Sequence, residues 1–596
     1  MGVVRCDTKR SRGIQPFEVP ESYRYLHDRI TKELPPRRNK IGGSCEEMIE
    51  VEEGVFLHTI ILFPSEGSPS PTVLIRNPYE YDIPRLLASV SHFVYFGYNV
   101  VLQSCRGSGK SDGRFVPFIY EKNDGLKTIE YISEQPWQNG EIVLFGFSYL
   151  SFCQYILADC LPEQVKTMFL DKLGVNRYAQ MYMNGMFRPE FYTAWMIAVT
   201  DMDRRLDRSG MYRRALEILP HKRVDEELFG RKVGHYQAVI SNVDKSSEFW
   251  QDTIWNGLQR MAGKLSVPVL MCAGWFDHQI KGMLHSYEGM REDVKKKSRF
   301  VIGPWDHLGM VPGDYPLENG MIMGSMSIKA GLEWFDYQLK GGKVPEDYLG
   351  THLYRCGSHL WEHSRDLPRT DTKKVFYLCP GREKPFLKGG RLDLHLSEEE
   401  AKVSYVYDPC DPVETLGGNS MMAWMFKGFE GARHGPVQLP SYEERSDVIS
   451  FCSQTLNRDL EVSGSVRVHL FAATDAEDTA FTAKVVEITE DGAAYHVCDG
   501  ITSIRYRNES DRALEYRAGE VVELILELWD ICWKWKAGSK LRVDISSSNF
   551  PAYINHKNTK TPWHEETRWR IANQLLYFGG KYPTRVELPI VTRGED

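Results

Sequence analysis

The chain has 596 residues and a mass of 68.6 kDa, which is too long for one ordinary core and predicts two to four domains. Hydrophobic residues make up 42% and charged residues 26%, and the net charge of −8 excludes a basic footprint for nucleic acid. Twelve cysteines run from Cys6 to Cys532 without a C-x-x-C pair, which indicates reduced thiols and neither a disulfide framework nor a zinc site.

The start of the chain, MGVVRCDTKRSRG, is polar and lacks the apolar core of a signal peptide. No apolar run approaches the roughly 18 residues of a membrane span. We therefore expect a cytoplasmic protein with no membrane and no nucleic-acid partner.

Residues 48–172 alternate short apolar runs with amphipathic stretches. The runs TVLIRNPY, YNVVLQSC, IVLFGF and VKTMFLDK predict strands, and NDGLKTIEYISEQ and SFCQYILADC predict helices between them. Continuous apolar runs that alternate with helices indicate a largely parallel sheet covered on both faces.

The pattern changes at about residue 174, where a block of helices without intervening strands is expected up to residue 261. The parallel-sheet pattern resumes with VPVLMCAGWFD and SRFVIGPWDH, and the helix AGLEWFDYQLKGG ends at two glycines. After about residue 372, runs such as SVRVHLFAAT and TAFTAKVVEIT alternate with turn residues, as in an antiparallel sandwich or jelly roll. The predicted domains are an α/β domain (1–173 and 262–371), an inserted helical cap (174–261) and a C-terminal jelly-roll β-sandwich (372–596).

The segment IVLFGFSYLS is similar to a nucleophile elbow, G-x-S-x-G, because Ser148 follows a predicted strand and precedes a predicted helix. Gly146 stands in place, but the last glycine of the motif is replaced by Leu150, and the next small residue is Ser151. The position alone therefore leaves two interpretations open: a catalytic serine or a serine that caps the helix.

A serine nucleophile needs a base and an orienting acid, which in this fold class follow in the order Ser, Asp or Glu, His. Asp277 ends one later apolar run and His307 follows the next, so we expect both beside Ser148 at the carboxyl ends of parallel strands. Asp171 is the alternative acid and His278 the alternative base.

The tetrahedral intermediate also needs hydrogen-bond donors for its oxyanion. The backbone N–H of Tyr149, directly after the serine, is one candidate by position. The hydroxyl of Tyr79, at the end of TVLIRNPY, is the second, unless Tyr79 is a core tyrosine.

Two other segments are similar to ligand-binding motifs but lack residues that those motifs need. The segment SCRGSGKSDG lacks the first glycine of a phosphate-binding loop and is not followed by a helix pattern, so Arg106 and Asp112 are expected to pair or to brace this loop. His564 begins an H-E-E-T-R segment that lacks the second histidine of a zinc-binding H-E-x-x-H motif. We expect no cofactor and no metal.

Eight separated segments together resemble one family, the cocaine-esterase-like (CocE/NonD) hydrolases, which are related to X-Pro dipeptidyl-peptidases and α-amino-acid ester hydrolases. The segments are IRNPYEYD, the arginine–glycine loop with SDGRFVP, GFSYL, AGWFDH, GPWDH, DPVETLGG, VSGSVRVHLFAATDAEDTAFTAKVVEITEDG and SSSNFP. The resemblance implies an α/β-hydrolase domain with a helical cap and a jelly roll. It also implies catalysis by Ser148, Asp277 and His307, with Tyr79 as an oxyanion donor.

The chain departs from the family at several positions. The family's elbow is G-x-S-Y-x-G, so Ser151 replaces a glycine, whereas the absence of glycine at Leu150 is a family feature. His278 and Gln279 follow the acid where the cocaine esterases have a small residue and an aromatic one. The resemblance implies that these two positions touch the acyl pocket, so the substrate is expected to differ. Further residues that could line a bulky apolar pocket are Phe191, Tyr192, Trp195, Met421 and Trp424.

The sequence therefore predicts a serine hydrolase that cleaves a carboxylic ester of a small, bulky-apolar acyl substrate through an acyl-enzyme. An amidase or peptidase of the X-Pro or β-lactam acylase type is the alternative, and it would need carboxylates such as Glu190 or Asp201 to hold a substrate amine. Two further alternatives are an acyltransferase with the same triad and a carbohydrate-binding protein with an inactive hydrolase domain. Whether the chain is monomeric, a homodimer or a larger homo-oligomer is left open.

Overall fold

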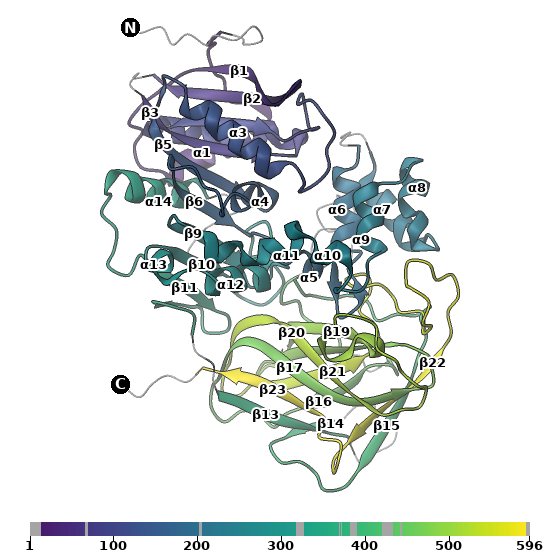
Figure 1. Ribbon diagram of the computed structural model, residues 1–596. Helices are drawn as coiled ribbons and strands as arrows, with labels where there is room; N and C mark the ends of the chain where they lie inside the picture. Colours follow the sequence, from purple (N-terminus) through teal and green to yellow (C-terminus); the bar gives the residue numbers. More distant parts are fainter. Residues whose placement is uncertain are drawn as a thin grey trace.

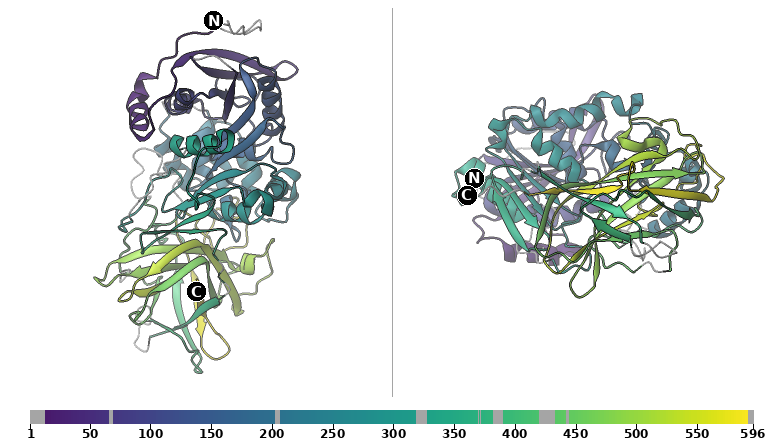
Figure 2. Two further views of the ribbon diagram at one scale, coloured as in Figure 1. Left: turned by 90° about the vertical axis from the view of Figure 1, so that its left-hand side faces the viewer. Right: turned by 90° about the horizontal axis from the view of Figure 1, so that it is seen from below.

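The computed structural model describes residues 13–65, 69–201, 206–317, 327–368, 370, 372–381, 390–419, 433–441 and 444–591. Within these residues the chain folds into an α/β part and a mostly-β part that are stacked end to end, with a helical insertion beside their junction (Figures 1 and 2). No helix in the described ranges is long and apolar enough to cross a membrane.

A ten-stranded sheet forms the centre of the α/β part, as far as the described residues show, in the order β1-β2-β4-β3-β5-β6-β9-β10-β11-β12. The strands from β4 to β11 in this order run parallel, whereas β1, β2 and β12 pair antiparallel at the two edges. Their bounds are β1 (Ile41–Glu52), β2 (Val55–Pro64), β3 (Ser70–Asn77), β4 (Asn99–Ser104), β5 (Gln138–Phe147), β6 (Val165–Asp171), β9 (Val269–Gly274), β10 (Arg299–Gly303), β11 (Gly350–Arg355) and β12 (Leu360–Ser364).

Helices cover both faces of this sheet. Their bounds are α1 (Arg24–Glu33), α2 (Ile83–Val90), α3 (Glu121–Ser133), α4 (Tyr149–Tyr155), α12 (Ile280–Glu288), α13 (Glu292–Lys295) and α14 (Ile328–Lys340). Along β5, Ile142 and Leu144 pack in the core cluster that contains α3, whereas Val143 and Phe145 pack in the cluster that contains α14. Burial on both faces explains why the central strands are continuously apolar.

The insertion between β6 and β9 is mainly helical and lies beside the carboxyl edge of the sheet (Figure 1). Its helices are α5 (Arg177–Met181), α6 (Tyr192–Val199), α7 (Arg208–Glu217), α8 (Val224–Phe229), α9 (Gly234–Ile240), α10 (Glu248–Gln251) and α11 (Thr253–Arg260). The expectation of helices without strands is wrong in one place, because β7 (Tyr182–Met183) and β8 (Met186–Phe187) form a short antiparallel pair. Gly185 turns the chain between them with φ +78°, and a two-residue ladder is too short to produce an alternating apolar pattern.

The C-terminal part is mostly β, and an eleven-stranded sheet is formed within its described residues. Its strands are β13 (Thr372–Cys379), β14 (Gly390–Asp393), β15 (Ala401–Tyr407), β16 (Ile449–Cys452), β17 (Leu460–Thr474), β18 (Ala480–Ile488), β19 (Ala494–Ser503), β20 (Val522–Trp535), β21 (Lys540–Ser546), β22 (Ala572–Phe578) and β23 (Arg585–Ile590). The pairing is antiparallel except between β14 and β16.

The loop that follows β4 is braced by ion pairs, although not by the pair expected between its own two residues. Arg106 binds Asp124 on α3 at 2.7 Å and Glu52 on β1 at 2.5 Å. Asp112 instead accepts a hydrogen bond from the backbone N–H of Phe56 at 3.1 Å. Residues far apart in the sequence supply these partners, which the local pattern does not reveal.

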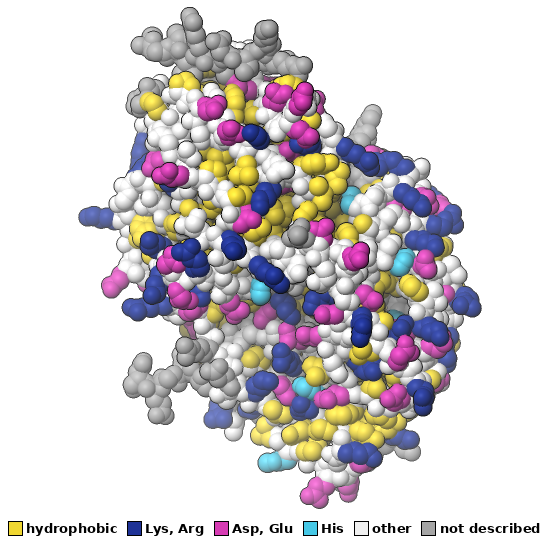
Figure 3. All heavy atoms as spheres, in the orientation of Figure 1, with side chains coloured by type: hydrophobic (Ala, Val, Ile, Leu, Met, Phe, Trp, Pro, Cys, Tyr) yellow, Lys and Arg dark blue, Asp and Glu magenta, His cyan; other side chains and the backbone are white. Residues whose placement is uncertain are grey.

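The surface drawn in Figure 3 carries Lys and Arg side chains interspersed with Asp and Glu side chains. This mixture is consistent with the modest net charge of −8.

Glycine is required at position 146 for steric reasons. A Cβ on Gly146 would lie 2.5 Å from the carbonyl carbon of Leu150 and 2.6 Å from its oxygen, because α4 packs directly on the end of β5. The side chain of Leu150 points into a core cluster instead, so this position does not need glycine.

We therefore predict that Gly146→Ala destabilises the protein by about 1–3 kcal/mol, as is usual for overpacking, and lowers its apparent Tm. Gly257→Ala is the matched control, because Gly257 lies in α11 with no atom within 4 Å of the added Cβ, and alanine favours a helix. Differential scanning calorimetry of both variants tests the prediction. Equal midpoints for the two variants would contradict it.

Candidate active site

Ser148 occupies the turn between β5 and α4, with φ 55° and ψ −118°. This conformation is costly for a residue that carries a Cβ, and such strain is typical of a nucleophile elbow. The Ser148 N–H donates a hydrogen bond to the carbonyl oxygen of Asp171 at 2.9 Å. The end of the neighbouring strand β6 therefore helps to hold the turn, and Ser148 remains half-buried at the edge of the sheet.

Ser151 is the small residue on the helix side of the turn, and it is completely buried. Its Oγ lies 2.8 Å from the carbonyl oxygen of Gly146 and 3.0 Å from that of Asp171, and it accepts a hydrogen bond from the Asp171 N–H at 2.9 Å. The Ser151 hydroxyl thus ties α4 to both β5 and β6.

His307 and Asp277 meet Ser148 at this corner of the sheet. His307 Nε2 lies 2.9 Å from Ser148 Oγ, and His307 Nδ1 lies 2.9 Å from Asp277 Oδ1. Asp277 follows β9, is fully buried, and also accepts a hydrogen bond from the Gln279 N–H at 3.0 Å. These contacts form one continuous hydrogen-bonded chain from carboxylate to imidazole to hydroxyl.

The loop that carries His307 is fixed from two sides. The preceding Asp306 is buried, and its Oδ1 accepts hydrogen bonds from the N–H groups of Leu308 at 2.8 Å and Met310 at 2.9 Å. Its Oδ2 lies 2.9 Å from Nε2 of His434, which belongs to the C-terminal part of the chain. The C-terminal part therefore contacts the loop that positions the imidazole.

The alternative acid, Asp171, is engaged elsewhere. Its carboxylate lies 2.7 Å from Nζ of Lys172, and both side chains are only 1% exposed. Asp171 thus pairs with a buried lysine, whereas Asp277 contacts His307.

The alternative base, His278, lies beside His307 and does not reach Ser148. Its ring packs between Phe191 and His307 at centroid distances of 4.3 and 4.6 Å. Within the described structure, neither of its ring nitrogens has a hydrogen-bond partner. Burial lowers the pKa of His278 well below its usual value, so the ring is neutral.

The two tyrosines expected near the oxyanion position are both present at the site. The backbone N–H of Tyr149 is at the first position of α4, where no intrahelical acceptor exists. The Tyr149 hydroxyl points away, donating to Glu121 at 2.5 Å and accepting from the N–H of Phe118 at 2.7 Å.

The hydroxyl oxygen of Tyr79 accepts a hydrogen bond from Nε1 of Trp195 at 3.3 Å. Its proton is therefore available for donation. Burial raises the pKa of Tyr79 above its usual value, which keeps the hydroxyl protonated.

A cavity of about 340 Å³ opens beside Ser148, and we call it the inner cavity. Its lining is mainly aromatic and includes Tyr79, Tyr81, Phe118, Phe147, Phe152, Phe191 and Trp195. Of the expected pocket residues, Phe191 and Trp195 line it, whereas Tyr192 stacks on Trp195 at 5.8 Å and faces a second cavity. His278 packs behind His307, and Met421 and Trp424 lie outside the described residues.

Asp277, His278 and His307 also bring three potential metal-ligand atoms within 4.8 Å of one another. Both ring nitrogens of His307 are already within hydrogen-bond distance of Asp277 and Ser148. The arrangement fits a proton relay better than it fits a metal centre.

Sequence reasoning missed Phe118 and Arg177, which also line the inner cavity. Gln279, at a position that the resemblance places beside the acyl pocket, lines the same cavity. Phe118 and Arg177 lie in a loop and at the start of the insertion, and no local pattern marks either residue.

Comparison with known proteins places both parts of the chain. The model of the X-Pro dipeptidyl-peptidase family (S15) matches residues 53–309, and that of the X-Pro dipeptidyl-peptidase C-terminal non-catalytic domain matches residues 333–587. A cocaine esterase from Rhodococcus sp. (strain MB1 Bresler) is 27% identical over 585 residues, which cover 92% of this chain and 98% of that protein. A putative serine esterase from Mycobacterium tuberculosis (strain CDC 1551 / Oshkosh) is 22% identical over 77% of this chain and 79% of its own length.

Two solved structures share the fold across most of the chain. An α-amino acid ester hydrolase has a TM-score of 0.76 at 20% identity, covering 94% of this chain and 98% of its own. A CocE/NonD family hydrolase from Staphylococcus aureus has a TM-score of 0.64 at 17% identity, covering 92% and 94%.

The fold and these matches define a hydrolase of the S15 serine peptidase and esterase class, with an α/β-hydrolase-like fold and a mostly-β C-terminal domain. The chain belongs to the CocE/NonD hydrolase family, and the resemblance noted in its sequence is thereby confirmed.

The bridging hydroxyl of Ser151 yields a test of the elbow. We predict that Ser151→Ala destabilises the protein by about 1–3 kcal/mol, because a buried N–H and two carbonyl groups lose a polar partner. Ser133→Ala is the control, because among the described residues the Ser133 hydroxyl donates to a carbonyl of its own helix, that of Ile129, at 2.8 Å. The apparent Tm of each variant, measured by circular dichroism, should fall for the first and stay within about 1 °C for the second.

Proposed function

We propose that this protein is a carboxylic-ester hydrolase that acts through an acyl-enzyme on Ser148. The observation that carries the proposal is the hydrogen-bonded chain from Asp277 through His307 to Ser148, with both contacts at 2.9 Å. This arrangement is able to activate a serine hydroxyl, because the imidazole accepts its proton and the carboxylate stabilises the resulting imidazolium.

The reaction follows from the positions of these atoms. His307 Nε2 takes the proton of Ser148 as Oγ attacks the ester carbonyl, and it then delivers that proton to the departing alcohol. In the second half, His307 takes a proton from water, the hydroxide attacks the acyl-enzyme, and the proton returns to Ser148 as the carboxylic acid leaves.

Two donors are proposed for the oxyanion: the backbone N–H of Tyr149 and the hydroxyl of Tyr79. The hydrogen bond from Trp195 to the Tyr79 oxygen supports this assignment, because it orients the hydroxyl and polarises its proton. Trp195 lies on α6 of the insertion, so the insertion contributes to the geometry of the oxyanion site.

We further propose that residues 174–261 act as a cap over the site and that residues 372–596 form a jelly roll, with the α/β-hydrolase domain comprising residues 1–173 and 262–371. The position of Phe191 and Trp195 in the lining of the inner cavity supports the role of the cap. The aromatic lining favours substrates with a bulky apolar group.

Amide hydrolysis of the X-Pro type is less well supported. Asp201, a candidate for holding a substrate amine, lies at the second cavity and is paired with Arg231 at 2.7 Å. Glu190, the other candidate, is buried and does not belong to the lining of either cavity.

Replacing the nucleophile tests the proposal directly. We expect Ser148→Ala to lower kcat/KM for aryl esters by at least about 10⁴-fold, since the remaining groups cannot form an acyl-enzyme. A fluorophosphonate probe should label the native protein and fail to label this variant, as read by intact-protein mass spectrometry. Undiminished ester turnover by Ser148→Ala would refute the assignment, and matched amides measured in parallel would reveal a peptidase.

The assignment of Tyr79 has its own test. Tyr79→Phe removes one oxyanion donor and should lower kcat by about 10²- to 10³-fold with a much smaller change in KM. Tyr155→Phe is the control, because that buried hydroxyl lies 3.5 Å from Ser286 Oγ and outside the inner cavity. Similar kcat values for the two variants would mean that Tyr79 is only a packing residue.

A further inference from the structure

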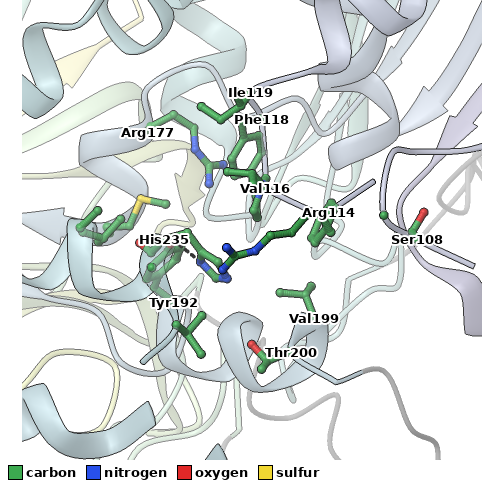
Figure 4. Close-up of a pocket in the computed structure, with 18 of the residues that line it drawn as sticks. Ser108, Arg114, Val116, Phe118, Ile119, Arg177, Tyr192, Val199, Thr200 and His235 are labelled. Atoms are coloured by element: carbon green, nitrogen blue, oxygen red, sulfur yellow. Dashed lines mark hydrogen bonds between the residues drawn. The ribbon is translucent and has the colours of Figure 1, made fainter. Parts of the chain in front are cut away.

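A second cavity of about 690 Å³, which we call the outer cavity, adjoins the inner one. It lies between the loop that follows β4 and the helices α5, α6 and α9 of the insertion (Figure 4). The two cavities have Phe118 and Arg177 in common. These two residues therefore stand at the junction between the space beside Ser148 and the outer cavity.

Arg177 is buried, and among the described residues no carboxylate forms an ion pair with it. Its exposed fraction is 7%, and its guanidinium carbon lies 3.9 Å from the centre of the Phe118 ring. Its one hydrogen bond in the described structure joins Nη1 to the side-chain oxygen of Gln180 at 2.5 Å, and Nε is buried without a partner. Figure 4 shows the guanidinium beside Phe118, directed into the pocket.

The electrostatic surroundings of Arg177 are consistent with this geometry. Burial lowers the pKa of Arg177 to about 10, and the nearby groups that oppose this shift are the hydroxyls of Tyr192, Tyr149 and Tyr79. Among the described residues, no carboxylate is one of the groups that raise this pKa, yet the guanidinium remains charged at neutral pH. A ligand of opposite charge would offset the free-energy cost of burying such an unpaired charge.

Three other buried arginines of the described residues lie beside carboxylates, whereas Arg188 binds the side-chain oxygen of Asn419 at 3.0 Å. Arg355 binds Glu362 at 2.6 Å, Arg542 binds Asp544 at 2.9 Å, and Arg76 lies 3.8 Å from Asp124. In the inner cavity itself, Arg85 binds Asp82 at 2.5 Å. Most of the buried arginines in the described residues therefore have a carboxylate close by, which Arg177 lacks.

The charges around the outer cavity also favour an anion. Arg114, Arg177 and Arg231 contribute to its lining, against the two carboxylates of Glu80 and Asp201. Asp201 and Arg231 form an ion pair that compensates both charges, which leaves Arg114 and Arg177 against Glu80. Arg114 extends towards His235 in Figure 4.

We propose that Arg177 is the recognition site for a carboxylate on the substrate, so that the preferred esters are apolar molecules that carry a carboxylate away from the scissile bond. The inference deepens the proposed ester hydrolysis and rests on it. The planar guanidinium offers parallel N–H donors that match a carboxylate, and the Phe118 ring holds its plane. Recognition by a cation also disfavours substrates that present a free amine at this point.

The test uses two pairs of esters that differ only in charge. In the acyl pair, monophenyl glutarate is compared with its methyl half-ester. In the leaving-group pair, the butyrate ester of 4-hydroxyphenylacetic acid is compared with the same ester of methyl 4-hydroxyphenylacetate. We expect the native protein to show a kcat/KM at least tenfold higher for the charged member of one pair, which also tells which side of the ester carries the carboxylate.

Substitution of Arg177 should abolish this preference. In Arg177→Met the ratio of kcat/KM for the charged and uncharged members should fall to within about twofold of unity, whereas Arg177→Lys should retain an intermediate ratio.

Arg299→Met is the matched control, because Arg299 also lies over an aromatic ring, Tyr348, at 4.1 Å but contributes to neither cavity. In Arg299→Met, the ratio of kcat/KM for the charged and uncharged esters should equal the ratio in the native protein. A preference for the uncharged member in both pairs, or a ratio that survives in Arg177→Met, would overturn the proposal.

A binding measurement separates this inference from the proposed reaction. Isothermal titration of glutarate into Ser148→Ala should give a Kd at least tenfold lower than titration into Ser148→Ala combined with Arg177→Lys. If this difference appears while the native protein hydrolyses no ester, the carboxylate site stands and the proposed reaction fails. If esters are hydrolysed but glutarate binds both variants equally, the carboxylate site fails and the reaction stands.

Discussion

The parallel pairing of β5, β6, β9 and β10 is the constraint on which the site depends. Phe147 lies opposite Asp171, Asp171 opposite Cys272, and Gly274 opposite Gly303, so the strands end at nearly the same level. Backbone hydrogen bonds set this register and therefore bring three loops to one corner of the sheet. The serine, the acid and the histidine each come from one of these loops, and a slip of one strand would separate them.

The insertion adds what the sheet alone does not provide. It supplies Trp195, which contacts the Tyr79 hydroxyl, and Phe191, which lies against the ring of His278. It also supplies Arg177, whose guanidinium meets Phe118 from the loop after β4. The sheet thus determines where the reacting groups stand, and the insertion determines the shape and charge of the space around them.

The C-terminal part is connected to the same site through a buried contact. His434 binds Asp306, and Asp306 in turn accepts hydrogen bonds from the backbone just after His307. Buried polar groups of this kind hold a loop in one conformation, because every alternative leaves a donor or an acceptor unsatisfied. The mostly-β part therefore stabilises the loop of the imidazole although it contributes none of the three side chains of the hydrogen-bonded chain.

Apolar periodicity and strand-end position are local properties, so the sequence alone predicted the central parallel strands, the elbow and the order of Ser148, Asp277 and His307. The tertiary structure decided between the alternatives: Asp171 is engaged by Lys172, and His278 packs against His307. It also explained why Leu150 is tolerated, since the close approach occurs at Gly146, and it revealed Arg177. These outcomes depend on contacts between segments distant in sequence, and no local pattern records which side chains will meet.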